Sequence, residues 1–147
     1  YTARTILSIS DEIVLLLKPH PITNLCYLDK VIHRLKSDRV KVSYLHPSLI
    51  SKHAIFGICN YYSTTMADCK NAGIPSIEFT KYAKFALEIT QNKSLRPEHV
   101  SLFISIDDTD KLIKIVEEIV EQNARRDCRQ VPDQREDLDP NILKIIA

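Results

Sequence analysis

Residues 13–21 read IVLLLKPHP and residues 54–65 read AIFGICNYYSTT, and these two stretches decide the fold. Each begins with a short, nearly continuous apolar run, which is typical of a strand that is buried on both faces. Each run then stops at polar residues: Lys18 and two prolines end the first, and residues 60–63 end the second. The two stretches therefore predict two buried strands, each followed by a polar loop.

Segments with helical periodicity lie between further short apolar runs. Residues 25–36, 46–53, 64–71 and 82–89 are expected helices, and residues 40–45, 75–79 and 100–106 are expected strands. Thr23 or Asn24 is placed to cap the first of these helices, and Gly73 is placed to close the third. The alternation predicts an α/β fold, a Rossmann-like parallel sheet with helices on both faces.

The strongest helical pattern comes last along the chain. Its apolar stripe consists of Leu112, Ile115, Val116, Ile119 and Val120. Asp107 and Asp110 are placed to bond the amides of its first turn, which explains these carboxylates better than a metal site does.

The composition changes after this helix. Residues 123–140 are rich in Arg, Asp, Gln and Glu, and residues 141–147 regain apolar character. We predict one domain over residues 1–122, followed by a polar linker and carboxyl-terminal extension over residues 123–147. The apolar end of the extension is a candidate docking segment for another part of the protein or another subunit.

The overall composition narrows the classes of function. Hydrophobic residues make up 44% of the chain and charged residues 27%, and the longest apolar run is too short to cross a bilayer, so we expect a soluble protein. The 20 basic and 19 acidic side chains are interspersed, which argues against nucleic acid as a partner. The four cysteines show no paired CxxC spacing, which argues against a zinc site and a secreted disulfide scaffold. We therefore expect a cytoplasmic protein with no bound metal.

The two polar loops are the best candidates for chemistry, because ligands of open α/β sheets bind beyond the carboxyl ends of strands. Ser63, Thr64 and Thr65 offer hydroxyls and the amides of a helix start to a phosphate. Lys18 adds a positive charge, and His20 can donate from a ring nitrogen and, when protonated, stabilise a departing phosphate oxygen. Together these residues predict a nucleotide-phosphate site.

Each of these residues also has an ordinary structural interpretation. Ser and Thr at a helix start are most often caps, a histidine in a loop is usually solvated, and a lysine at a strand end usually keeps that edge soluble. The functional interpretation rests on finding both loops at equivalent strand ends. It requires Lys18 and His20 to converge with Ser63 and Thr64 on one anion.

Two further residues rank lower. Glu78 is placed to reach a ribose or a base, but a surface carboxylate is the simpler interpretation. His46-Pro47 is a second HP pair, which we place in a connecting turn and rank well below His20.

At these positions the sequence resembles the nucleotide-binding domain of bacterial surface-polysaccharide transferases of the GT-B type. The resemblance covers residues 13–79, and the HP motif at His20 and the pair Ser63-Thr64 look like those of bacterial sialyltransferases, polysialyltransferases and capsule Kdo transferases, which use CMP-activated sugars. Ala67 and the turn Gly73-Ile74-Pro75 match the structural part of the pattern. Thr64, where Ser is frequent, and the polar triplet Asp68-Cys69-Lys70 depart from it.

The resemblance implies the carboxyl-terminal half of a GT-B fold and a role for each matching residue. His20 would act in catalysis by contacting the nucleotide phosphate and stabilising or protonating the leaving group, and Lys18 would assist it. Ser63 and Thr64, with Thr65 beside them, would bind the phosphate. The expected donor is a CMP-linked sugar such as sialic acid.

The resemblance also implies partners that this chain does not contain. A glycan is the expected acceptor, in capsule or other surface polysaccharide synthesis. An amino-terminal domain is expected to supply the general base, and the chain begins at Tyr1 without an initiator methionine, so we expect residues before it in the full-length enzyme. That enzyme is expected in the cytoplasm, with a peripheral association with the inner membrane.

Two alternatives remain open at the level of sequence. The sequence also resembles glycerophosphotransferases of teichoic acid synthesis, which use CDP-glycerol. The resemblance lies in the order of motifs: a strand followed by KPHP, a second strand followed by Ser-Thr and a helix, and then GxP before a third strand. The other alternative is a non-catalytic nucleotide-binding or assembly module of the same fold.

Overall fold

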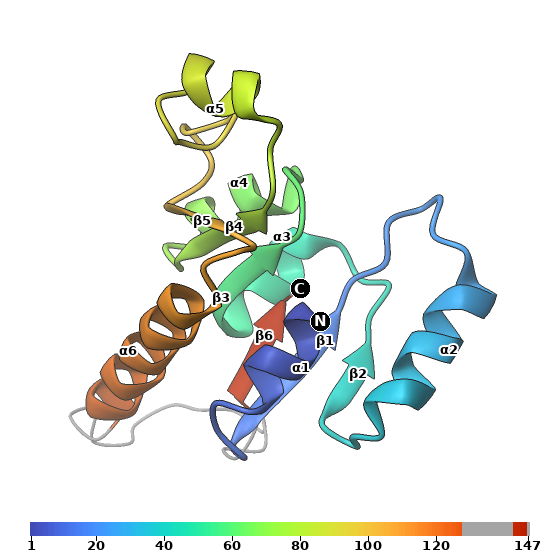
Figure 1. Cartoon of the computed structure of the whole chain (residues 1–147). Helices are drawn as coiled ribbons and strands as arrows, with labels where there is room; N and C mark the ends of the chain where they lie inside the picture. The colour runs from blue at the N-terminus through green and yellow to red at the C-terminus, as the bar shows by residue number, and fades with distance from the viewer. Residues whose placement is uncertain (128–142, 147) are drawn as a thin grey trace.

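The computed structural model describes residues 1–127 and 143–146, and its centre is a six-stranded parallel sheet (Figure 1). The strands are β1 (Ile13–Leu17), β2 (Val40–Val42), β3 (Ala54–Cys59), β4 (Ser76–Thr80), β5 (Leu102–Ser105) and β6 (Leu143–Ile146). Their order across the sheet is β2-β1-β6-β3-β4-β5, and every pairing is parallel. The expected α/β class with a parallel sheet is confirmed.

Helices lie on both faces of this sheet, as expected. One face is covered by α1 (Thr2–Leu7), α2 (Leu25–Leu35) and α6 (Thr109–Asp127). The other face is covered by α3 (Pro47–Ile50), the 3-10 turn η1 (Ser51–His53) and α4 (Thr65–Asn71). Helix α5 (Lys84–Ile89) has no buried residue and projects beyond the carboxyl ends of the strands (Figure 1).

The main hydrophobic core lies between the sheet and the helices α1 and α6. Its largest fully buried side chains include Ile6, Ile13, Leu15, Phe56, Ile58, Ile77, Phe79, Ile104 and Leu112. Burying one such side chain stabilises the fold by about 1.5–3 kcal/mol, so this layer supplies most of the driving force for folding.

Local signals in the sequence fix several element ends. Asn24 caps α2 by accepting a hydrogen bond from the Tyr27 amide at 3.1 Å, and α2 ends at Lys36 in the left-handed conformation. Gly73 has a φ of 74° after α4, as its expected role as a left-handed cap requires. Gly57 lets α4 approach β3 closely, because a Cβ atom there would lie 2.4 Å from the Cys69 Sγ.

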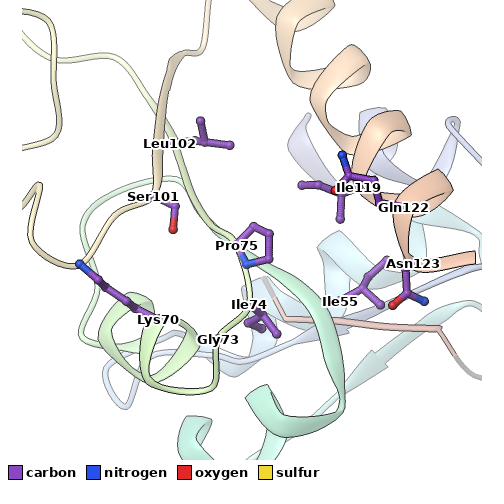
Figure 2. A pocket seen from close by; sticks show the side chains of 10 residues that line it. All are labelled: Ile55, Lys70, Gly73, Ile74, Pro75, Ser101, Leu102, Ile119, Gln122 and Asn123. Carbon is purple, nitrogen blue, oxygen red and sulfur yellow. The ribbon is translucent and has the colours of Figure 1, made fainter. Parts of the chain in front are cut away.

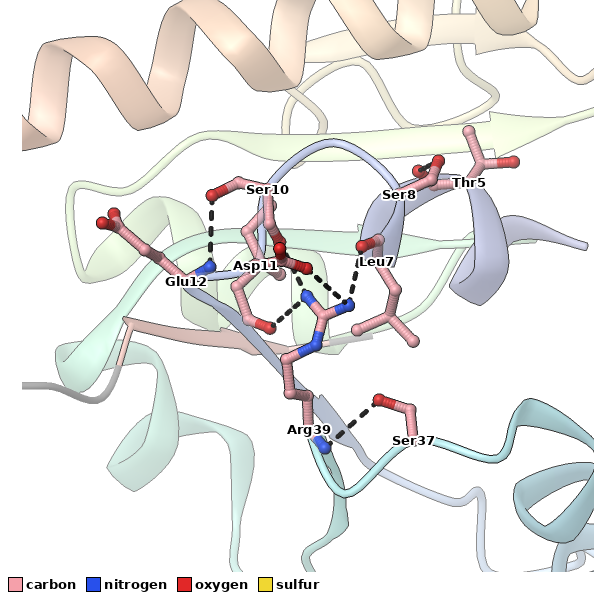
Figure 3. Close-up of polar contacts among 9 residues, drawn as sticks. Thr5, Leu7, Ser8, Ser10, Asp11, Glu12, Ser37 and Arg39 are labelled. Carbon is pink, nitrogen blue, oxygen red and sulfur yellow. Dashed lines mark hydrogen bonds and ion pairs between the residues drawn. The ribbon is translucent and has the colours of Figure 1, made fainter.

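Arg39 connects β2 to the turn between α1 and β1 at the amino edge of the sheet (Figure 3). Its guanidinium donates to the carbonyl oxygens of Ser10 at 2.7 Å, Leu7 at 3.0 Å and Ile13 at 3.4 Å. It also pairs with Asp11 at 3.5 Å. The Arg39 side chain therefore provides hydrogen-bond donors for three backbone carbonyls in and beside the turn that precedes β1.

The carboxyl-terminal part of the chain differs from the expected linker and extension. Helix α6 continues to Asp127, so the expected linker start at residue 123 falls inside a helix. Residues 143–146 form β6, which pairs with β1 on one side and β3 on the other. They complete the sheet of the same domain and are not a separate docking extension, since their backbone is bonded on both sides. Residues 128–142 and 147 lie outside the described residues.

Smaller differences occur at element ends. Helix α1 was not expected, β2 ends at Val42 and β5 covers Leu102–Ser105. The start of α6 is capped by Asp108, whose Oδ1 accepts from the Lys111 amide at 3.2 Å, whereas Asp107 pairs with Lys81 at 2.7 Å. None of the helices in the described residues has the length and apolar character needed to cross a membrane.

Candidate functional site

The strand order reverses direction between β1 and β3. From β1 the chain crosses through α2 to β2 at one side, and from β3 it crosses through α4 to β4 at the other, with β6 between the two starting strands. At such a switch point the loops beyond the carboxyl ends of the strands diverge, and ligands of open α/β sheets bind there. Both polar loops singled out in the sequence leave strands that flank this point.

The loop after β1 presents Lys18 and His20. Lys18 is half-buried, and its Nζ donates to the Pro19 carbonyl at 3.3 Å. His20 is exposed, and its Nδ1 accepts a hydrogen bond from the Ile22 amide at 3.4 Å. Because Nδ1 acts as an acceptor, the neutral imidazole has its proton on Nε2. The loop therefore offers an ammonium group and an N–H donor.

The loop after β3 presents Ser63, Thr64 and Thr65 at the start of α4. The Ser63 Oγ accepts from the Thr65 amide at 3.3 Å and donates to the Thr65 Oγ1 at 3.2 Å, so its hydroxyl is bonded within the turn that precedes α4. The exposed Thr64 makes no side-chain capping bond. Since α4 has only 7 residues, its helix dipole is small, and the hydroxyl groups are the main polar feature of this loop.

The two loops lie at the same edge of the sheet, one strand apart. Neighbouring strands are about 4.8 Å apart, so the ends of β1 and β3 are separated by roughly 10 Å across β6. No hydrogen bond or ion pair between described residues joins the two loops. The structure brings Lys18 and His20 to the same edge as residues 63–65 without direct contact between them.

Glu78 is fully buried on β4, so its interpretation as a surface carboxylate is wrong. The Tyr82 hydroxyl donates to Oε1, while Oε2 is buried without a hydrogen-bond partner among the described residues. Glu78 lies on the same side of the sheet as its register partner Cys59. Burial, and then the negative charge of Glu78, raise the pKa of the Cys59 thiol to about 12. A buried carboxylate oxygen without a hydrogen-bond partner is costly, so Oε2 is an unsatisfied acceptor inside the fold, out of reach of a ligand in this conformation.

Sequence reasoning named Glu78 but missed its burial, because the residues on either side suggest a strand with one exposed face. Glu78 alternates with Ile77 and Phe79, and such alternation is typical of a strand with one solvated face. In the structure the polar side, formed by Ser76, Glu78 and Thr80, is also buried. A tyrosine four residues later, able to reach back to the carboxylate, was the one local signal.

Aromatic rings and an amide hold the region around Glu78. Tyr82 stacks on Phe103 with ring centroids 5.4 Å apart and meets Tyr61 edge to face at 5.9 Å. The Asn60 amide donates to the Phe79 carbonyl at 3.1 Å and to the Thr2 Oγ1 at 2.7 Å. These contacts fix the start of the loop that bears Ser63.

The segment before β5 holds the same loop from the other side. The Tyr62 ring stacks on His99 with centroids 6.3 Å apart, and the Arg96 guanidinium lies 5.7 Å from the centre of the Tyr62 ring. Lys70 of α4 donates to the carbonyl of Glu98. The residues beside Ser63 are therefore tied to three other parts of the chain.

A pocket of about 540 Å³ lies at the opposite edge of the sheet (Figure 2). Its walls come from the amino ends of β4 and β5 and from the last turns of α6, and they include Ile55, Ile74, Pro75, Leu102 and Ile119. Lys70 at its rim already bonds the Glu98 carbonyl. Because this pocket is mainly apolar and at the amino edge, we place the candidate site at the carboxyl edge.

The described residues contain no group of three or more His, Cys, Asp or Glu side chains placed to hold a metal ion. In comparisons with known proteins, the chain matches no protein-family model, no curated protein and no solved structure.

Proposed function

We propose that this chain is the donor-binding domain of a glycosyltransferase and holds a nucleotide phosphate between the loops that follow β1 and β3. The observation that supports this most is their position: both loops leave strands that flank the switch point, at one edge of the sheet. One loop supplies Lys18 and His20, and the other supplies hydroxyl groups. Cations, N–H donors and hydroxyls are the groups that bind phosphate in proteins.

Each residue has a distinct role in the proposed reaction. When the bond between the anomeric carbon and the phosphate oxygen breaks, negative charge grows on that oxygen. The Nε2–H group of His20 donates to this oxygen and stabilises the leaving group. The positive charge of Lys18 lowers the free energy of the developing negative charge. Ser63, Thr64 and Thr65 bind the remaining phosphate oxygens through their hydroxyls.

The resemblance to CMP-using transferases favours a CMP-activated sugar as donor and a surface glycan as acceptor. In this proposal the general base for the acceptor hydroxyl belongs to an amino-terminal domain, and the full-length enzyme works in the cytoplasm at the periphery of the inner membrane. The proposal requires no metal ion, since the charge of the phosphate is met by side chains.

Calorimetric titration of the chain with CMP, CDP and UDP tests the proposal. We expect binding of at least one cytidine nucleotide, and we expect His20→Ala and Ser63→Ala each to weaken it by about tenfold, the loss of one charge-assisted hydrogen bond. His53→Ala is the matched control, because His53 is an exposed histidine in η1, directly before β3 at the amino edge. A folded chain that binds none of the three nucleotides contradicts the proposal.

A further inference from the structure

The second HP pair, His46-Pro47, begins α3 and holds its imidazole in the same way as the first. The His46 Nδ1 accepts from the Ser48 amide at 3.3 Å and lies 2.8 Å from the Ser48 Oγ. His20 accepts from the amide of Ile22, also two residues further along. In both neutral imidazoles Nε2 is therefore the nitrogen with the proton.

The topology brings the two HP loops together. Strands β1 and β2 are neighbours with Leu17 opposite Val42, and the Ser43 amide donates to the Leu17 carbonyl at 2.9 Å, just past the end of β2. The loops that bear His20 and His46 thus leave the same edge side by side. The imidazole of His46 is exposed.

Helix α3 places His46 next to the switch point and not at the outer side of the sheet. Ile50 of α3 packs with Leu16 of β1 and Ala54 of β3, the two strands that flank β6. Helix α3 also contacts α4, the helix that follows the Ser/Thr loop (Figure 1). The segment that bears His46 therefore crosses from β2 to β3 beside the switch point.

The cationic and N–H groups at this edge have no acidic partners of their own. Within residues 1–127 and 143–146, no carboxylate lies within 4.0 Å of Lys18, His20 or His46, whereas Lys81 at the same edge pairs with Asp107. His46 therefore adds an exposed N–H donor beside the donors that the proposed function assigns to the first phosphate. A donor at this second position suits a second anionic group of the same ligand.

We infer that His46 binds a second anionic group of the donor, while His20 and Ser63 bind the first phosphate. The inference rests on the proposed function and narrows its substrate class. A sugar acid linked to a nucleoside monophosphate has a carboxylate as its second anion, and a nucleoside-diphosphate donor has a second phosphate. In either case His46 donates through Nε2 and sets the preference for doubly anionic donors.

Titrations of the chain with CMP, CDP and CMP-sialic acid test the inference, because CMP lacks the second anionic group. We expect His46→Ala to weaken CDP or CMP-sialic acid by about tenfold and to leave the affinity for CMP within about twofold. A loss of affinity for CDP identifies the second phosphate as the group that His46 binds. A loss of affinity for CMP-sialic acid identifies the carboxylate as that group. His53→Ala, at the other end of the same connection, is expected to change none of the affinities.

A second variant separates binding from folding. His46→Asp keeps an oxygen acceptor for the Ser48 amide, and so the cap of α3, but replaces the N–H donor with a negative charge. We expect it to lower the affinity for the doubly anionic ligand more than His46→Ala does, at an unchanged unfolding midpoint.

The outcomes distinguish the two proposals. Unchanged affinities in both His46 variants, with His20→Ala still impaired, overturn the inference and leave the proposed function standing. Equal losses for CMP and the doubly anionic ligands also overturn it, because His46 then acts on the first phosphate. If the unaltered chain binds none of the three ligands, the proposed function fails and this inference with it.

Discussion

The two halves of the sheet differ at the carboxyl edge. In the half with β1 and β2, Arg39 bonds the turn at the amino edge, while the side-chain bonds of the HP loop at the carboxyl edge stay within that loop among the described residues. In the half with β3 and β4, the carboxyl edge is also bonded to distant parts of the chain. There Asn60 bonds two distant residues and Tyr82 bonds Glu78.

This difference gives the candidate site one preformed wall and one adaptable wall. Regions with few tertiary contacts open locally at low free energy, whereas regions with buried bonds open only with the whole fold. We therefore expect the Ser/Thr loop to keep its conformation without a ligand and the HP loop to adopt a single conformation when an anion binds. The following predictions test that contrast, starting from the largest expected effect.

Among the single substitutions, removing Arg39 is expected to cost the most stability. Arg39→Ala loses three bonds to backbone carbonyls from a side chain that is only 25% exposed, so we expect the free energy of unfolding to fall by about 3 kcal/mol. Urea denaturation measures it. Arg125→Ala is the control, because Arg125 is exposed and its one ion pair within the described part of the chain is with Glu121, so a loss below about 0.5 kcal/mol is expected. Equal losses in the two variants would show that Arg39 does not hold the amino edge.

Tyr82→Phe is expected to have the next largest effect. It removes the hydrogen bond to a buried carboxylate, which leaves both oxygens of Glu78 without a donor, so we expect a loss of about 2 kcal/mol. A double-mutant cycle with Glu78→Gln measures the coupling directly. If the two losses add without coupling, the preformed wall does not depend on this bond.

The same contrast explains which parts of the fold were predictable from the sequence. Strands β1 and β3 were found because strands buried on both faces need uninterrupted apolar runs, which Ile13–Leu17 and Ala54–Cys59 provide. Asn24 and Gly73 marked helix ends through chemistry that is local to a few residues. Signals of this kind need no knowledge of distant neighbours.

The missed parts all depend on distant contacts. Strand β6 is four residues long and is a strand because β1 and β3 bond it from both sides, far away in the chain. Helix α1 is short, and its Ile6 and Leu7 are buried against elements that follow later. Glu78 is buried by Tyr82 and by neighbouring strands, which its flanking residues do not reveal.

High pH is expected to weaken the half with β3 and β4 selectively. Burial raises the pKa of Cys59 to about 12 and of Cys69 to about 11, and burial and Glu78 raise the pKa of Tyr82. An unfolded thiol titrates near about 8.5, so above that pH the unfolded chain has lost protons that the folded chain keeps, and stability falls as pH rises. We expect a slope approaching about 1.4 kcal/mol per pH unit for each buried thiol.

Denaturation at pH 7, 9 and 10 measures this slope. The double variant Cys59→Ala with Cys69→Ala is the control, and its stability is expected to fall less steeply over the same range. A slope that the double variant does not reduce would mean that other groups dominate.

The smallest expected effect appears in thiol reactivity, which compares the two halves without altering either. Cys26 is exposed on α2 beside the HP loop, while Cys69 is buried between α4 and β3 and Cys59 is largely covered. Thiol reagents attack the thiolate, so the raised pKa values of Cys59 and Cys69 slow their modification further at neutral pH. We expect peptide-resolved mass spectrometry to show rapid alkylation of Cys26 and slow alkylation of the other two, with all three equal in denaturant. Alkylation of Cys69 as fast as that of Cys26 in the native chain would mean that α4 separates readily from β3, and the Ser/Thr loop at its start would not be the preformed wall.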